Sequence, residues 1–248
     1  MENNIAVLGR GYSLKKYKKY SHLFEKIYIV GRFYREIEKL GIKHFKNKKI
    51  IHVVSRTDTP LKNNLYKKLN VRYVQICFHS LKQFIDSHGK DLTKKYPKNV
   101  KLKALPECVR DRGYPPLPSE DILKYCSEYD NYKDLCKYLQ DEFPNEIKKI
   151  QKETRRTRYW PTAGLVAIDV ALNENDLDKL YLFGIDNYTN ITYVLYKLNE
   201  FKKPYINTST ELVFYHIYQL VKEFPNIQFY SSSPSEKFDF DLPNWYLF

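Results

Sequence analysis

Two glycine-containing turns in the sequence have the residue types that can hold a phosphate. The first is Gly9-Arg10-Gly11-Tyr12-Ser13, and the second is Gly184-Ile185-Asp186; each directly follows a short apolar run. Glycines let a chain turn sharply and let backbone N–H groups approach a phosphate, and a helix N-terminus behind such a turn adds partial positive charge. The first turn is an incomplete dinucleotide fingerprint, because Leu14 stands at the third glycine position and Gly31-Arg32 follows the second apolar run in place of an acidic residue. The pattern fits a nucleotide site and a plain strand-to-helix turn equally well.

A third segment, Thr162-Ala163-Gly164, opens a predicted apolar helix. The unpaired N–H groups of a helix start, together with the Thr162 hydroxyl, can hold an anion or a ribose. In open α/β sheets, ligands bind outside the carboxyl ends of the strands, which is where the two glycine turns are predicted to lie. We therefore expect all three segments to contribute to one site.

Taken together, these segments resemble the paired nucleotide-binding motifs of sialyltransferases. The bacterial lipooligosaccharide sialyltransferases have a Gly-x-Gly-Pro-Ser-Leu turn, a Thr-Ser-Gly helix start and a Gly-Ile-Asp-Phe-Tyr turn, to which Gly9–Leu14, Thr162–Gly164 and Gly184–Tyr188 are similar. The eukaryotic enzymes share a Pro-(Ser/Thr)-(Thr/Ser)-Gly helix start, similar to Pro161–Gly164. The resemblance covers the N-terminal segment and Arg158–Tyr193, is weaker over Pro204–Tyr230, and does not extend to the middle of the chain.

The resemblance implies a metal-independent glycosyltransferase without a cofactor. It would transfer a sugar, such as sialic acid or a related acidic sugar, from a nucleotide-activated donor of the CMP type rather than the UDP type to an acceptor hydroxyl, for example on a glycan. Tyr188 and Tyr193 correspond to two tyrosines that stabilise the departing phosphate in the bacterial family. The nucleotide-binding residues that we expect are Gly9, Arg10, Gly11, Ser13, Arg32, Thr162, Ala163, Gly164, Gly184, Ile185 and Asp186.

The chain departs from the family at the catalytic base. The family has a histidine shortly before the match at Thr210-Glu211, where this chain has Tyr205 or Ile206. The candidate bases are Tyr205, His216, Asp186 and Glu211. Either the donor and acceptor differ from the sialyl case, or catalysis has been lost. Arg10 and Arg32 stand at or beside positions where the family has asparagine, which favours an acidic or diphosphate-bearing donor.

Apolar segments that alternate with helical ones predict the elements that position these residues. The strands are expected at 5–8, 27–30, 50–54, 71–77, 179–183 and 227–230, and the helices at 13–20 (capped by Ser13), 33–40, 60–69, 80–87, 146–158, 162–172 and 209–223. This alternation indicates a Rossmann-like α/β fold, with a mostly parallel sheet and helices on both faces, as one domain over 1–248. The resemblance implies the single-domain GT-A-like variant of sialyltransferases. The proline-rich segment 91–145 is interpreted as an irregular, then helical, lid or acceptor-binding insertion.

Composition limits the partners. The formal charge is +13, which favours phosphate-bearing partners: nucleotides, nucleic acid on a basic surface, or an anionic membrane in peripheral contact. A general richness in Lys, Asn, Ile and Tyr explains the charge equally well, so the charge alone does not identify a partner. We expect a cytoplasmic protein, because no signal peptide or membrane span is visible and the four cysteines have no C-x-x-C spacing. Asp176-Leu177-Asp178 and Asp239-Phe240-Asp241 are interpreted as accidental rather than as metal motifs, so no metal ligands are predicted. Two alternative functions stay open: a glycosyltransferase-like enzyme that modifies nucleic-acid bases, and a non-catalytic nucleotide-binding protein.

Overall fold

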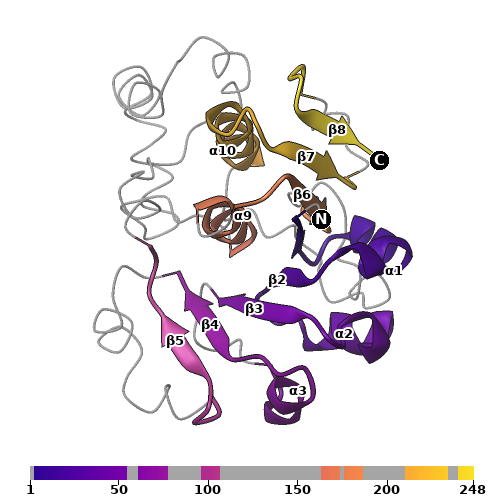
Figure 1. The fold of residues 1–248 in the computed structure, drawn as a ribbon, viewed down its shortest axis with the longest axis vertical. Helices are drawn as coiled ribbons and strands as arrows, with labels where there is room; N and C mark the ends of the chain where they lie inside the picture. Colours follow the sequence, from indigo (N-terminus) through magenta and orange to yellow (C-terminus); the bar gives the residue numbers. More distant parts are fainter. Residues whose placement is uncertain are drawn as a thin grey trace, which may run out of the picture.

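A single parallel β-sheet forms the centre of the protein (Figure 1). The computed structural model describes residues 3–54, 61–77, 96–106, 163–173, 176–186, 210–233 and 240–248. Within these ranges the sheet has eight strands in the order β5-β4-β3-β2-β1-β6-β7-β8, and all neighbouring pairs are parallel. The strands are β1 (Asn4–Leu8), β2 (Lys26–Val30), β3 (Lys49–Val54), β4 (Tyr73–Ile76), β5 (Lys101–Lys103), β6 (Lys179–Phe183), β7 (Gln228–Ser231) and β8 (Trp245–Leu247).

The strand order reverses direction at β1. From β1 the chain adds β2 to β5 on one side, and later β6 to β8 on the other. Ile5 is paired with Lys26 of β2 and with Leu180 of β6, so the first strand of the chain lies in the middle of the sheet. The carboxyl ends of β1 and β6 therefore meet at the topological switch point, the place where open α/β sheets bind ligands.

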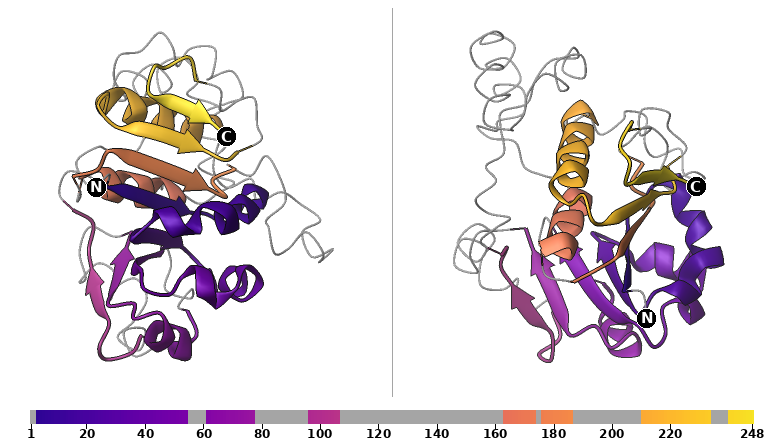
Figure 2. Two further views of the ribbon diagram at one scale, coloured as in Figure 1. Left: turned by 45° about the vertical axis from the view of Figure 1, so that its right-hand side comes forward. Right: turned by 45° about the horizontal axis from the view of Figure 1, so that its top comes forward.

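Helices cover both faces of the sheet, as Figure 2 shows. One face packs against α9 (Ala163–Asn173) and α10 (Thr210–Glu223). The other face packs against the 3-10 helix η1 (Tyr12–Lys16), α1 (Tyr17–Tyr20), α2 (Tyr34–Leu40) and α3 (Asn63–Lys68). Two shorter 3-10 turns, η2 (Ser21–Leu23) and η3 (Ile42–His44), lead into β2 and β3. The expected α/β class with a parallel sheet is confirmed, because side chains on both faces of the strands are buried.

Two edge strands were not predicted. Residues 101–103 lie inside the segment that we interpreted as an irregular lid, yet they form β5 beside β4. The residues around Trp245 form β8 beside β7, where we predicted no strand from the sequence. Both strands have three residues, and β5 is the alternating Lys-Leu-Lys, so neither has the continuous apolar run of a central strand. The rest of 91–145 lies outside the described residues apart from 96–106, and its role as a lid stays a prediction.

The helix predictions that fall on described residues agree with the structure apart from their N-terminal ends. Ser13 does not cap a helix, because it lies inside η1 and its side chain bonds to Asp186. The helix expected at 60–69 begins at Asn63. The helices expected at 80–87 and 146–158 fall outside the described residues.

Candidate functional site

The two glycine turns meet at the switch point. The Gly9 N–H donates to the Phe183 carbonyl oxygen at 2.7 Å, and the Gly11 N–H donates to the Gly184 carbonyl oxygen at 2.8 Å. The turn after β1 is thus joined to the end of β6 and to the turn that follows β6. The backbone N–H groups of both glycines are used within the protein, and the role of these residues in the turn under a nucleotide stays a prediction.

Close packing of the two turns explains why glycine stands in them. A Cβ atom on Gly9 would lie 2.7 Å from Ile185 Cδ1, and one on Gly11 would lie 2.8 Å from Asp186 Cβ. Gly184 has φ +66°, and a Cβ there would lie 2.6 Å from the Gly9 carbonyl oxygen. These glycines allow one loop to touch the other, and together the two loops form the floor of the switch point.

A buried chain of hydrogen bonds links three strands beneath this floor. Ser13 donates its backbone N–H to Asp186 Oδ2 at 2.9 Å and its hydroxyl to Asp186 Oδ1. The Ser13 hydroxyl accepts the Gly184 N–H at 3.0 Å and lies 3.0 Å from Ser232 Oγ. Ser232 follows β7 and also lies 3.0 Å from the Leu182 carbonyl oxygen. The ends of β1, β6 and β7 are held together by side chains that are almost fully buried.

Asp186 is the charged member of this network. Burial raises the pKa of its carboxyl, while hydrogen bonds from the Ser13 side chain, the Ser13 N–H and the Tyr12 N–H oppose the rise. Both carboxylate oxygens accept bonds from Ser13, and the residue is 2% exposed. This environment suits a residue that holds the site in place. It suits a general base less well, because a base must reach the acceptor hydroxyl.

Arg10 lies between the two turn glycines and is paired with a carboxylate that the sequence did not point to. Its Nε donates to Glu36 Oε1 at 2.9 Å, and the side chain of Glu36 is completely buried whereas that of Arg10 is 29% exposed. Burial raises the pKa of Glu36, and the Arg10 charge opposes this. The second oxygen of Glu36 has no hydrogen-bond partner among the described residues. The Arg10 guanidinium is thus fixed at Nε by a buried carboxylate, while part of the side chain stays exposed to solvent.

Arg32 follows β2 on the exposed surface, and its backbone position depends on a buried histidine. Gly31 has φ +62°, and its carbonyl oxygen lies 2.7 Å from His52 Nε2. The Nδ1 atom of His52 lies 3.0 Å from the Tyr66 hydroxyl, which accepts the Leu61 N–H at 3.1 Å. Burial lowers the pKa of His52 to about 4, so the ring is neutral. His52 Nε2 therefore donates to Gly31, and Nδ1 accepts from Tyr66.

The remaining predicted residues are described only in part. Ala163 and Gly164 form the start of α9, which runs back along the sheet into β6, so they lie at the same edge of the sheet as the glycine turns. His216 lies in α10 and is 6% exposed. Thr162, Tyr188, Tyr193 and Tyr205 fall outside the described residues, and their roles stay predictions.

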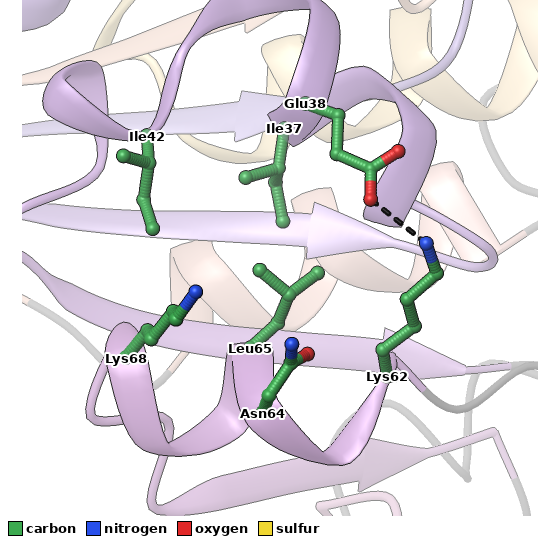
Figure 3. Close-up of a pocket in the computed structure, with 7 residues that line it drawn as sticks. All are labelled: Ile37, Glu38, Ile42, Lys62, Asn64, Leu65 and Lys68. Carbon is green, nitrogen blue, oxygen red and sulfur yellow. Dashed lines mark hydrogen bonds and ion pairs between the residues drawn. The ribbon is translucent and has the colours of Figure 1, made fainter.

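A separate hollow lies on the outer helical surface. Figure 3 shows this pocket, with a volume of about 350 Å³. Its lining comes from α2, η3 and α3: Ile37, Glu38, Ile42, Lys62, Asn64, Leu65 and Lys68. A salt bridge of 2.8 Å between Lys62 and Glu38 crosses its rim, and both side chains are more than half exposed. The pocket includes none of the residues at the switch point.

Both residues of the first Asp-x-Asp pair, Asp176 and Asp178, are hydrogen-bonded to Asn3. Asp178 Oδ2 accepts the Asn3 N–H at 2.9 Å, and the Asp176 carbonyl oxygen accepts from the Asn3 side chain. The pair precedes β6, at the end of the sheet opposite to the glycine turns. In the part of the chain that the structure describes, no three His, Cys, Asp or Glu side chains gather as metal ligands would. No helix in that part has the length and apolar character to cross a bilayer.

Sequence reasoning missed three residues of this region: Glu36, Ser232 and His52. Ser232 could have been found, because Ser231-Ser232-Ser233 stands directly after a predicted strand, at the edge where ligands bind. Glu36 and His52 had no comparable signal, because a single acidic residue in a helix and a single histidine in a strand do not show their partners.

Comparison with protein-family models gave no match, and comparison with curated proteins gave none either. Among solved structures, the chain is similar to the sialyltransferase CST-II, whose crystal structure is a complex with a trisaccharide acceptor and CMP. The sequences are 15% identical, the match covers 98% of this chain and 87% of the other, and the TM-score is 0.48. The fold class itself rests on the strand order and register of this chain.

Proposed function

We propose that the protein is a glycosyltransferase that binds a nucleotide-activated sugar at the switch point between β1 and β6. The observation that carries this proposal is the joining of Gly9–Ser13 to Gly184–Asp186, two segments far apart in the sequence that resemble the nucleotide motifs of one family. The resemblance favours a CMP-type donor with an acidic sugar, an acceptor hydroxyl, and chemistry that needs no metal.

The charges at the site support an anionic donor. Arg10 is fixed at Nε by Glu36, which leaves its other guanidinium N–H groups for a ligand at the end of β1. A guanidinium that is already oriented loses little side-chain entropy when it binds a phosphate or a carboxylate. Arg32, at the end of the neighbouring strand β2, adds a second positive charge on the same side.

In the reaction that we propose, a base removes the proton of the acceptor hydroxyl, and the resulting oxygen attacks the anomeric carbon. The bond from that carbon to the nucleotide phosphate breaks, and the phosphate leaves with the electron pair. Arg10 would stabilise the charge on the leaving group, and Tyr188 and Tyr193 would donate hydrogen bonds to it. Tyr205, His216 and Glu211 stay candidates for the base.

Calorimetric titration with CMP and UDP, each with and without Mg²⁺, tests the proposal. We expect CMP to bind without metal. The double variant Arg10→Gln/Glu36→Gln removes the arginine without leaving a buried carboxylate unpaired, and it should weaken CMP binding by about tenfold or more. Arg35→Gln is the control, because Arg35 is exposed on the same helix as Glu36.

Each outcome separates one part of the proposal from the others. Binding of UDP only in the presence of metal would contradict the CMP assignment and keep a glycosyltransferase. No nucleotide binding at all would contradict the proposed site. If CMP binds and no donor is turned over, the non-catalytic alternative is favoured. Tyr188→Phe should lower turnover more than donor affinity, and unchanged turnover would remove Tyr188 from the mechanism.

A further inference from the structure

The positive charge of the protein is concentrated in one part of the fold. Residues 10–49 contain thirteen lysines and arginines and three glutamates, a formal charge of +10 out of +13 for the whole chain. The described residues from 163 onward contain two lysines and seven acidic residues, a formal charge of −5. A composition rich in lysine throughout would not produce this polarity. Among the described residues, the segment 10–49 is therefore a source of strong positive field, and the residues from 163 onward are not.

Five lysines of this region lie around two turns that are bonded to each other. The turn η2 and the turn η3 are joined by a contact of 2.8 Å between Ser21 Oγ and His44 Nδ1. The group consists of Lys18, Lys19, Lys43, Lys46 and Lys48, and we name it the α1–η3 patch. All but Lys48 are exposed.

The field of these lysines reaches His44. Burial lowers the pKa of His44, and the charges of Lys43, Lys18 and Lys48 lower it further. Lysines from α1, from η3 and from the turn before β3 therefore act on one point, although they are separated in the sequence. A set of like charges that is held together in this way suits an anionic partner.

An exposed apolar side chain, Leu23, lies in η2, one of the two turns of the patch. Leu23 is 38% exposed and is one of three large apolar side chains that are exposed in the described part of the chain. Lys48 Nζ donates at 2.5 Å to the carbonyl oxygens of Ser21 and Phe24, on both sides of Leu23. The turn that presents Leu23 is thus closed by a lysine of the patch itself. An exposed leucine on a turn that carries a cluster of lysines matches the boundary between lipid headgroups and acyl chains.

The same surface fits nucleic acid less well. The patch has lysines and no arginine, so it lacks the planar groups that bind phosphates and bases in bidentate geometry. The nearest aromatic rings have little free surface for base stacking: Tyr17 is fully buried, Lys15 lies 3.8 Å above the Tyr12 ring, and Lys19 lies 5.4 Å from the centre of the Tyr20 ring. A phosphate backbone also offers no contact for Leu23.

We propose that the α1–η3 patch binds the surface of an anionic membrane, with its lysines on the headgroups and Leu23 inserted at the acyl boundary. The patch lies before β2 and β3, at the amino ends of the strands, whereas the glycine turns lie at the carboxyl ends. The membrane contact is therefore separate from the candidate nucleotide site, and both can be occupied at once.

Co-sedimentation of the full chain with phosphatidylcholine vesicles, with and without phosphatidylglycerol, tests this. We expect binding to the anionic vesicles alone, and weaker binding at high salt. Each lysine near an anionic surface contributes about 1 kcal/mol, which is somewhat less than tenfold in the partition coefficient. The variant Lys18→Glu/Lys43→Glu/Lys46→Glu should therefore reduce the partition coefficient by roughly 100-fold or more. The control Lys67→Glu/Lys101→Glu/Lys222→Glu makes the same change in net charge on α3, β5 and α10 and should retain most of the binding.

The variant Leu23→Ser distinguishes insertion of the leucine into the membrane from electrostatic attraction of the lysines to it. It should reduce vesicle binding by about fivefold. Its stability should change little, because the Leu23 side chain is exposed. Equal loss in the two triple variants would overturn the proposal, because binding would then follow net charge and not this patch. Unchanged binding of Leu23→Ser would overturn the inserted leucine. Failure of the wild type to sediment with anionic vesicles, or tighter binding to duplex DNA or single-stranded RNA in fluorescence anisotropy, would overturn the membrane assignment.

Discussion

Replacing Ser13 by alanine should damage the protein far more than the loss of one hydroxyl suggests. The hydroxyl donates to the buried Asp186 carboxylate and accepts the buried Gly184 N–H. A hydrogen bond to a charged group contributes about 1.5 to 3 kcal/mol, and a buried N–H without an acceptor costs about 1 to 3 kcal/mol. Since both losses occur together, we expect Ser13→Ala to lower the free energy of unfolding by about 3 to 5 kcal/mol. For a chain of this length that corresponds to roughly 10 °C in Tm.

The measurement is equilibrium unfolding in urea, with Ser231→Ala as the matched control. Ser231 is a buried serine at the end of β7, and its hydroxyl accepts the Ser233 N–H at a longer 3.3 Å. Its loss should cost about 1 kcal/mol. If Ser13→Ala proves no more destabilising than Ser231→Ala, the hydrogen-bond network beneath the switch point is not what holds β1 to β6.

The pH dependence of Ser13→Ala gives a second readout. Burial raises the folded-state pKa of Asp186 above its unfolded value, and the Ser13 side chain opposes that rise. The native state therefore binds a proton more readily than the unfolded state, and stability falls as pH rises from about 4 through the folded-state pKa. Without the hydroxyl, the folded-state pKa is higher still. The stability deficit of Ser13→Ala should then narrow as pH falls, and a deficit that widens would refute the assigned role of Asp186.

Three further predictions follow from the site. In urea unfolding, Gly184→Ala should lower the free energy of unfolding by about 2 kcal/mol more than Gly31→Ala does. Both residues have positive φ, but a Cβ on Gly184 meets the opposing loop whereas one on Gly31 meets nothing within 4 Å. Equal losses of stability would mean that the two loops separate easily. In an NMR titration, His52 should stay neutral down to about pH 4. Because its pKa is lowered on folding, His52 contributes stability above about pH 6.5 that is lost as pH falls toward 4. A titration midpoint near pH 6.5 would contradict its burial. Burial raises the pKa of Glu36, so in weakly acidic solution the free energy of unfolding should fall with rising pH less steeply in Glu36→Gln than in the wild type. An unchanged slope of unfolding free energy against pH would show that Arg10 already compensates the carboxylate.

The sequence predicted the central part of the fold because its signals there are local. β1, β2, β3 and β6 are apolar runs bounded by turn residues, and such runs form strands wherever both faces are covered. β5 and β8 escaped prediction because edge strands can be short and partly polar.

At the candidate site, the two glycine turns lie together at the carboxyl ends of β1 and β6, and their part in binding stays a prediction. The contacts between the two turns could not be foreseen. The N–H groups of Gly9 and Gly11 bond to the carbonyl oxygens of Phe183 and Gly184, a use that the glycine pattern alone does not reveal. A glycine required by a ligand and a glycine required by a neighbouring loop look the same in a sequence. Likewise, Ser13 fits the pattern of a helix cap until Asp186 is brought to it from 173 residues away.

The position of β1 also determines the order in which the molecule can be completed. The strand leaves the ribosome well before its partner β6, which begins only at Lys179. At roughly 5 to 20 residues per second, about 9 to 35 seconds pass between the synthesis of the two strands. During that interval β1 through β4 can assemble as a half-sheet whose growing edge is the apolar β1. This nascent edge is a target for chaperones and for premature association with other chains, and it closes only when β6 arrives.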